Sequence, residues 1–128
     1  MIYIEYTDEF LEGEPGPNFY WRGRPRDFIK IIADLHPLGS NNETEIKLNN
    51  LALIQVNSDH IITARSCEGG STLCSIKGNN ILIELDKKLW RGVISLFLSV
   101  SFERSHNYVE FDNYDLKEDA NFIINSEI

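Results

Sequence analysis

Apolar residues that alternate with polar ones predict a series of short strands along this chain. Residues 2–6 show the pattern first, and it recurs in seven later segments: 44–48, 51–56, 60–65, 71–77, 81–85, 108–111 and 121–125. Gly78, Asn79 and Asn80 favour a tight turn, so the segments on either side of them are expected to form a hairpin. Residues 7–18 hold four acids, two glycines and two prolines, which predicts an irregular acidic loop.

Two segments show the spacing of an amphipathic helix. The first has four apolar residues on one predicted face, namely Phe28, Ile31, Ile32 and Leu35. Pro25 suits the first helical position, because that position needs no amide hydrogen. Pro37 and Gly39 are expected to end this helix.

The second predicted helix begins after a cap at Asp86 and runs to about Arg104. Residues 94–102 also alternate as a strand would, so the pattern alone allows both structures. Four apolar residues nevertheless share one helical face: Val93, Leu96, Phe97 and Val100. A strand of this reach would exceed the usual length, which favours the helix.

These elements predict a single α+β domain over 1–128, with an antiparallel sheet and two main helices packed on one face. The halves also resemble each other. Ile2-Tyr3-Ile4-Glu5 is similar to Ile81-Leu82-Ile83-Glu84, and the tripeptide Trp-Arg-Gly occurs at 21–23 and again at 90–92. We interpret 1–66 and 79–128 as possible pseudo-repeats of a strand, helix, strand, strand unit. The alternative is a chance similarity between common α+β patterns.

Composition and charge narrow the function classes. Hydrophobic residues make up 42% of the 128 residues, enough for one continuous core. The formal net charge is -8, which repels nucleic-acid phosphates and anionic membranes. Such a surface suits a basic protein partner, although the charge could equally serve solubility.

The chain shows no sign of secretion or of membrane insertion. No basic segment and no cleavage motif follow Met1, and serines interrupt the longest apolar run, 93–102. We therefore expect a cytoplasmic protein.

Residue types that carry catalysis or bind metal are few. Cys67 and Cys74 do not have the spacing of a zinc or redox site. They are expected to be small thiols in a reducing compartment, or a disulfide in an oxidising one. The histidines are expected to be structural or exposed: His36, His60 and His106. No P-loop, nucleophile elbow or dinucleotide-binding motif occurs, so we expect no enzyme activity, no metal and no cofactor.

Charged residues form two kinds of cluster. One acidic cluster is Asp8, Glu9, Glu12 and Glu14, interleaved with Phe10 and Leu11. The other is Glu110, Asp112, Asp115, Glu118 and Asp119, interleaved with Tyr114. Acids around an aromatic residue fit a protein interface with steering charges, or else a solvated loop. Basic residues precede both predicted helices: Arg22, Arg24, Arg26, Lys87, Lys88 and Arg91. These either pair with the acids or bind a small anion.

The chain resembles the immunity proteins of bacterial polymorphic-toxin and contact-dependent growth inhibition systems. The resemblance lies in its length, its acidity, the Trp-Arg-Gly segment before 27–35, and the ending over 106–112 and 122–127. It implies a protein that binds the C-terminal domain of a cognate toxin, often a basic nuclease, and blocks its active site. The two acidic clusters would then form the toxin-binding surface. The alternatives are a small-molecule-binding or regulatory module, with a ligand held between the halves, and an oligomeric scaffold.

Overall fold

A computed structural model describes residues 1–9, 16–41, 44–68, 73–102, 106–112 and 119–126. The helices are α1 (Pro25–Ser40), α2 (Lys87–Phe102) and the short 3-10 helix η1 (Leu48–Asn50). The strands are β1 (Ile2–Thr7), β2 (Asn18–Gly23), β3 (Glu45–Lys47), β4 (Ile54–Val56), β5 (Ile61–Cys67), β6 (Leu73–Lys77), β7 (Asn80–Asp86), β8 (His106–Asp112) and β9 (Asp119–Ser126).

The strands form two sheets. The first sheet has the order β4-β1-β2-β9-β8, and the second has the order β3-β5-β7-β6. The predicted α+β class, with two main helices packed on sheet, is confirmed. The prediction of one antiparallel sheet is wrong, because both sheets are mixed: β2 pairs parallel with β9, and β5 with β7. The first pair joins strands from opposite ends of the chain and the second joins strands on either side of β6, so no pattern within one segment indicates either pair.

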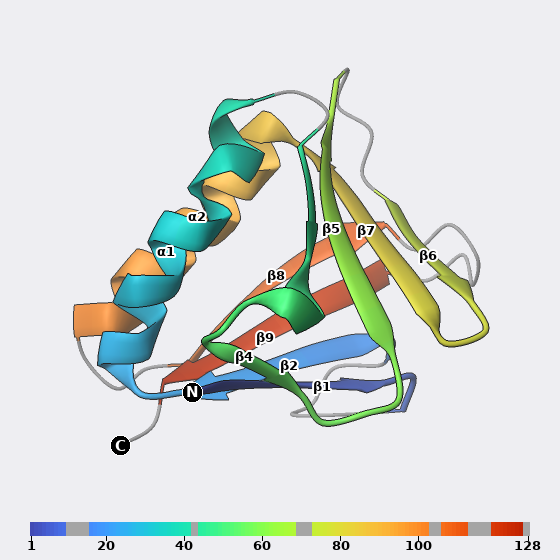
Figure 1. Ribbon diagram of the computed structural model, residues 1–128, viewed down its shortest axis with the longest axis horizontal. Coiled ribbons are helices and arrows are strands. Elements are labelled where there is room, and N and C mark those ends of the chain that lie inside the picture. The colour runs from blue at the N-terminus through green and yellow to red at the C-terminus, as the bar shows by residue number, and fades with distance from the viewer. Residues whose placement is uncertain (10–15, 42–43, 69–72, 103–105, 113–118, 127–128) are drawn as a thin grey trace.

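The helices and the two sheets enclose one core. Figure 1 shows α1 and α2 side by side along one flank, with the two sheets opening away from them. Large side chains fill the space between, including Trp21, Trp90, Phe19, Phe28, Phe97 and Phe122. The ring of Phe97 lies 5.0 Å from that of Trp21 and 5.6 Å from that of Phe28. Both helices and both sheets therefore contribute to a single hydrophobic cluster.

The two halves of the chain share one element order and one pairing register. The first half runs β1, β2, α1, β3, β5 and the second runs β6, β7, α2, β8, β9. Each sheet combines the opening hairpin of one half with the closing strand pair of the other. Phe19 pairs with Phe122 in the first sheet as Ile81 pairs with Ile62 in the second. The buried helix faces also correspond, with Phe28, Ile31, Leu35 and Leu38 matched by Trp90, Val93, Phe97 and Val100 at the same spacing.

This correspondence differs from the predicted repeat. Trp21 lies in strand β2 whereas Trp90 lies in helix α2, so the two Trp-Arg-Gly tripeptides are not equivalent. Each unit begins with a hairpin rather than one strand, and the second begins at Leu73. The sequence reading also omitted β2, because its residues 18–21 are buried on both faces and therefore do not alternate.

The helices begin where the sequence predicted, and one ends later. Asp86 caps α2, since its Oδ1 accepts a hydrogen bond of 2.7 Å from the backbone N–H of Leu89. The helical interpretation of 94–102 is confirmed. The predicted end of α1 is wrong, because the helix continues through Pro37 and Gly39 to Ser40. A proline in the last turn removes only one hydrogen bond, so the helix tolerates it there.

The region predicted as two strands between 51 and 65 divides between the sheets. Only Ile54–Val56 forms the earlier strand, which pairs parallel with β1 in the first sheet. The later strand, β5, lies in the second sheet.

The hairpin of β6 and β7 is confirmed, and Gly78 takes a positive φ of 60° in its turn. No helix in the described part of the chain is long and apolar enough to cross a membrane.

Candidate functional site

Both acidic segments adjoin the same end of the first sheet. Strand β1 ends at Thr7 and β2 begins at Asn18, while β8 ends at Asp112 and β9 begins at Asp119. Asn18 pairs with Asn121 in the parallel register of β2 and β9, so all four strand ends lie together. We call this the acidic end. It lies on the right of the first sheet in Figure 1, away from the start of α1.

A buried pair of asparagines ties the base of the acidic end. The side-chain amide of Asn121 donates to the side-chain oxygen of Asn18, and the amide of Asn18 donates to the backbone oxygen of Glu9 at 3.0 Å. The backbone N–H of Asn121 donates to the carbonyl of Pro17 at 3.1 Å. These bonds fix the chain beside the acids, because both side chains are buried within strands that the core holds.

The structure places half of the predicted toxin-binding residues. Asp8 and Glu9 are exposed directly after β1, and the backbone N–H of Glu9 donates to the Thr7 hydroxyl at 3.1 Å. Asp112 and Asp119 are paired directly across β8 and β9. The remaining predicted residues lie outside the described ones: Glu12, Tyr114, Asp115 and Glu118. Two clusters far apart in the sequence thus meet at one end of one sheet.

The other end of β2 carries basic residues around a hollow of about 570 Å³. Arg22, Arg24 and Arg26 line it together with Tyr3, Asp27 and Asn57. Strand β2 ends here at Gly23, and α1 begins two residues later. We call this the arginine hollow. It lies at the opposite end of β2 from the acidic end.

Asp27 is the acid that lines the hollow. Its Oδ2 accepts a hydrogen bond of 2.9 Å from the Met1 ammonium group. Burial alone would raise the pKa of Asp27, but that bond and the charges of Met1, Arg26 and Lys30 outweigh it and hold the pKa below its ordinary value. Asp27 therefore remains ionised and is already engaged by the ammonium group.

The predicted basic cluster divides between the two helix starts. Lys87, Lys88 and Arg91 belong to α2, away from the hollow, and the Arg91 guanidinium donates to the carbonyl of Gly39 at 3.2 Å. That bond is a helix-to-helix contact. The arginine hollow therefore takes its positive charge from the first three of the six basic residues.

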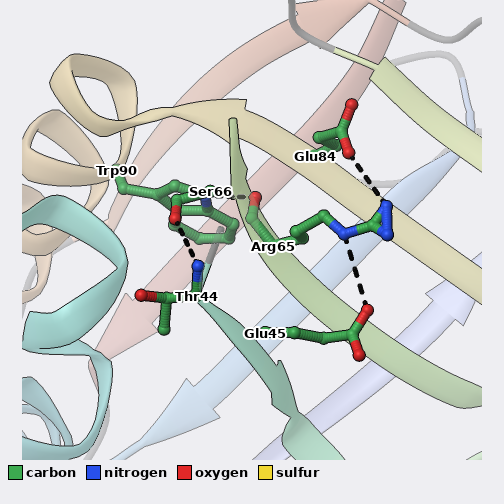
Figure 2. A network of polar contacts seen from close by, with 6 residues as sticks. All are labelled: Thr44, Glu45, Arg65, Ser66, Glu84 and Trp90. Carbon is green, nitrogen blue, oxygen red and sulfur yellow. Dashed lines mark hydrogen bonds and ion pairs between the residues drawn. The ribbon is translucent and has the colours of Figure 1, made fainter. Parts of the chain in front are cut away.

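Sequence reasoning missed a polar network on the second sheet, shown in Figure 2. The Arg65 guanidinium lies 3.2 Å from the Glu84 carboxylate and 3.5 Å from that of Glu45. The indole N–H of Trp90 donates to the carbonyl of Arg65 at 2.8 Å. Opposite charges stand on paired strands, a signal that becomes visible only once the register is known.

The two cysteines lie in the second sheet, with Cys67 half-buried at the end of β5 and Cys74 buried in β6. Whether they pair in an oxidising compartment stays a prediction. The ring of His60 stacks edge-on against Tyr6 at 4.8 Å, and its Nδ1 lies 2.9 Å from the Ser58 hydroxyl. Burial first, then the charges of Cys74 and Asp8, raise the pKa of Tyr6 to about 12. Among the residues described, no group of three metal-binding side chains occurs.

Comparison with protein families, with curated proteins and with solved structures found no match to this chain. The surfaces themselves must therefore indicate the function. The acidic end and the arginine hollow carry charges of opposite sign, and β2 connects them.

Proposed function

We propose that this protein binds the C-terminal domain of a cognate bacterial toxin and neutralises it by covering its active site. The observation that carries the proposal is the meeting of both acidic segments at one end of the first sheet. A basic toxin domain, such as a nuclease, would present the complementary charge. The acidic end would occupy the cleft that such a toxin uses for nucleic acid.

Concentrated like charge supports a role in binding. Asp112 and Asp119 are partners in the register of β8 and β9. Asp8 and Glu9 add exposed acids at the same end. A basic partner would offer the complementary charge to this concentration of acids.

The buried asparagines support tight binding. A surface that is already ordered loses less entropy on association than one that must first be fixed. The Asn18–Asn121 bond holds the base of the acidic end from inside the fold. We therefore expect a one-to-one complex with little rearrangement of the strands that carry the acids.

The direct test is co-expression with the toxic C-terminal domain of a large secreted protein encoded immediately upstream. A stable complex on size exclusion, together with protection of cells that express the toxin domain, is expected. A toxin domain that purifies alone and stays active with an equimolar amount of this protein would contradict the proposal.

Association kinetics then locate the surface. The variant Asp8→Asn/Glu9→Gln, and separately Asp112→Asn/Asp119→Asn, should slow association about tenfold at low salt and flatten its salt dependence. The matched control is Asp34→Asn/Glu45→Gln, which removes two exposed acids from α1 and β3. If the control slows association as much as the two test variants do, the acidic end is not the toxin-binding surface.

A further inference from the structure

The arginine hollow holds three guanidinium groups that form no ion pair with the described residues. No carboxylate of the described residues lies within ion-pair distance of Arg22, Arg24 or Arg26, whereas Arg65 has two. Asp27, which also lines the hollow, is bound to the Met1 ammonium group. A surplus of positive charge therefore remains in this hollow on a protein whose formal net charge is -8.

The start of α1 adds positive charge to the same place. Arg24 occupies the N-cap position and makes no side-chain cap, whereas the corresponding residue of α2, Asp86, caps its helix. Pro25 has no N–H, and the N–H groups of Asp27 and Phe28 donate to the Arg24 carbonyl, so it is the positive end of the helix dipole that attracts anions here. Arginines at this position increase the local positive charge, which a bound anion would neutralise.

Arg22 is held in place but keeps its hydrogen-bonding capacity. Its guanidinium lies 5.7 Å over the ring of Tyr20, and the Tyr20 hydroxyl accepts a hydrogen bond of 2.9 Å from the Asn125 amide. The Nε of Arg22 is buried without a hydrogen-bond partner in the described structure. Its cation–π contact orients the side chain without using an N–H donor.

We propose that the arginine hollow binds a phosphate monoester. Three guanidinium groups and a helix start match the charge and the three terminal oxygens of a phosphate better than the single charge of a carboxylate. The hollow is larger than a phosphate group alone, and the Tyr3 side chain beside it is 38% exposed. This leaves room for the organic part of the ligand, next to an aromatic ring and the Asn57 amide.

Inorganic phosphate and pyrophosphate are suitable probes. Calorimetric titration should show saturable binding of both anions. The dissociation constant for phosphate should be on the order of 1 mM or lower. The midpoint of thermal unfolding should rise with phosphate in the same saturable manner. Acetate and chloride at equal ionic strength serve as the carboxylate and salt controls, and acetate binding as tight as that of phosphate would overturn the assignment.

Matched variants separate a site from general salt effects. Arg24→Gln/Arg26→Gln removes two exposed charges at the start of α1, and Lys87→Gln/Lys88→Gln removes two charges at the start of α2, where Lys88 is exposed and Lys87 is half-buried. The first variant should lose at least tenfold in phosphate affinity, while the second should bind as the wild type does. Arg22→Lys keeps the charge but loses the planar guanidinium group with its several N–H donors. It should weaken phosphate binding about fivefold. Equal phosphate binding by both double variants would overturn the proposal.

This site is independent of toxin binding. The arginine hollow and the acidic end lie at opposite ends of β2, so the variants of one surface leave the other intact. Loss of phosphate binding in Arg24→Gln/Arg26→Gln should therefore leave toxin association unchanged.

Discussion

The side-chain amide of Asn121 donates a hydrogen bond of 3.1 Å to the side-chain oxygen of Asn18, inside the first sheet. Both residues are buried, and they come from the two halves of the chain. Asn121→Ala would leave the Asn18 oxygen without this donor, which costs about 1–3 kcal/mol of unfolding free energy. Urea unfolding measures the change. Because the residues are partners, the double alanine variant should lose less stability than the sum of the single variants.

The two acids that bind Arg65 should contribute unequally to stability. The side chain of Glu84 is 18% exposed and lies closer to the guanidinium than that of Glu45, which is 58% exposed. Glu84→Gln is expected to cost about 1 kcal/mol and Glu45→Gln less than about 0.5 kcal/mol, since solvent screens the exposed pair. Thermal unfolding at low and high salt checks both values. An equal loss in the two variants would contradict this ranking.

Two helical glycines should respond oppositely to alanine. A Cβ at Gly92 would meet nothing within 4 Å, so Gly92→Ala should stabilise the protein by about 0.5–1 kcal/mol through helix propensity. A Cβ at Gly39 would lie 2.8 Å from Cγ of Arg91, where α1 and α2 approach each other. Gly39→Ala should therefore gain nothing or lose about 1 kcal/mol. Chemical denaturation of the two variants measures both changes, and a gain of stability in Gly39→Ala equal to that in Gly92→Ala would contradict the close helix contact.

The starts of the two helices differ in a way that mutation can reverse. Asp86→Ala should destabilise the protein by about 1 kcal/mol, because α2 loses its cap. Arg24→Asp should stabilise it by up to about 1 kcal/mol, because a carboxylate would then cap α1 and offset its dipole. The same variant should lose phosphate binding. A loss of stability in Arg24→Asp would show that the arginine serves the fold.

Tyr6 should make the stability of the protein sensitive to alkali. Its folded pKa is raised to about 12, above the value near 10 expected in the unfolded chain. The native state thus favours the neutral phenol, so this contribution is complete below about pH 10 and is lost as the pH rises toward 12. Tyr6→Phe should lose less stability than the wild type between about pH 9 and pH 11. Urea unfolding at the two pH values measures the difference, and equal losses would contradict it.

Local patterns predicted most elements, and tertiary pairing explains the errors. The cap at Asp86, the helical face from Phe28 to Leu35 and the β6–β7 hairpin depend on neighbours in sequence, and each is present. The last turn of α1 contacts Arg91 of the other helix, and no local rule contains such a contact. Strand β2 was missed because both of its faces are buried, an environment that the sheet creates.

The candidate site was predictable in composition but not in position. The acids at 8–12 and 112–119 could be identified as clusters, yet their meeting requires the parallel pairing of β2 with β9. The same pairing places Arg22 at the opposite end from the acids. The sequence grouped the six basic residues before the helices together, whereas the antiparallel arrangement of α1 and α2 in Figure 1 separates them.

Each sheet takes strands from both halves of the chain, and this has a consequence for synthesis on the ribosome. When β5 has emerged, neither sheet has its central parallel neighbour, since β7 and β9 are still to come. The growing chain must then carry uncovered apolar strands, which favours protection by a chaperone until β9 is released. Long-range pairing of this kind also folds slowly, so the first sheet should close late in folding.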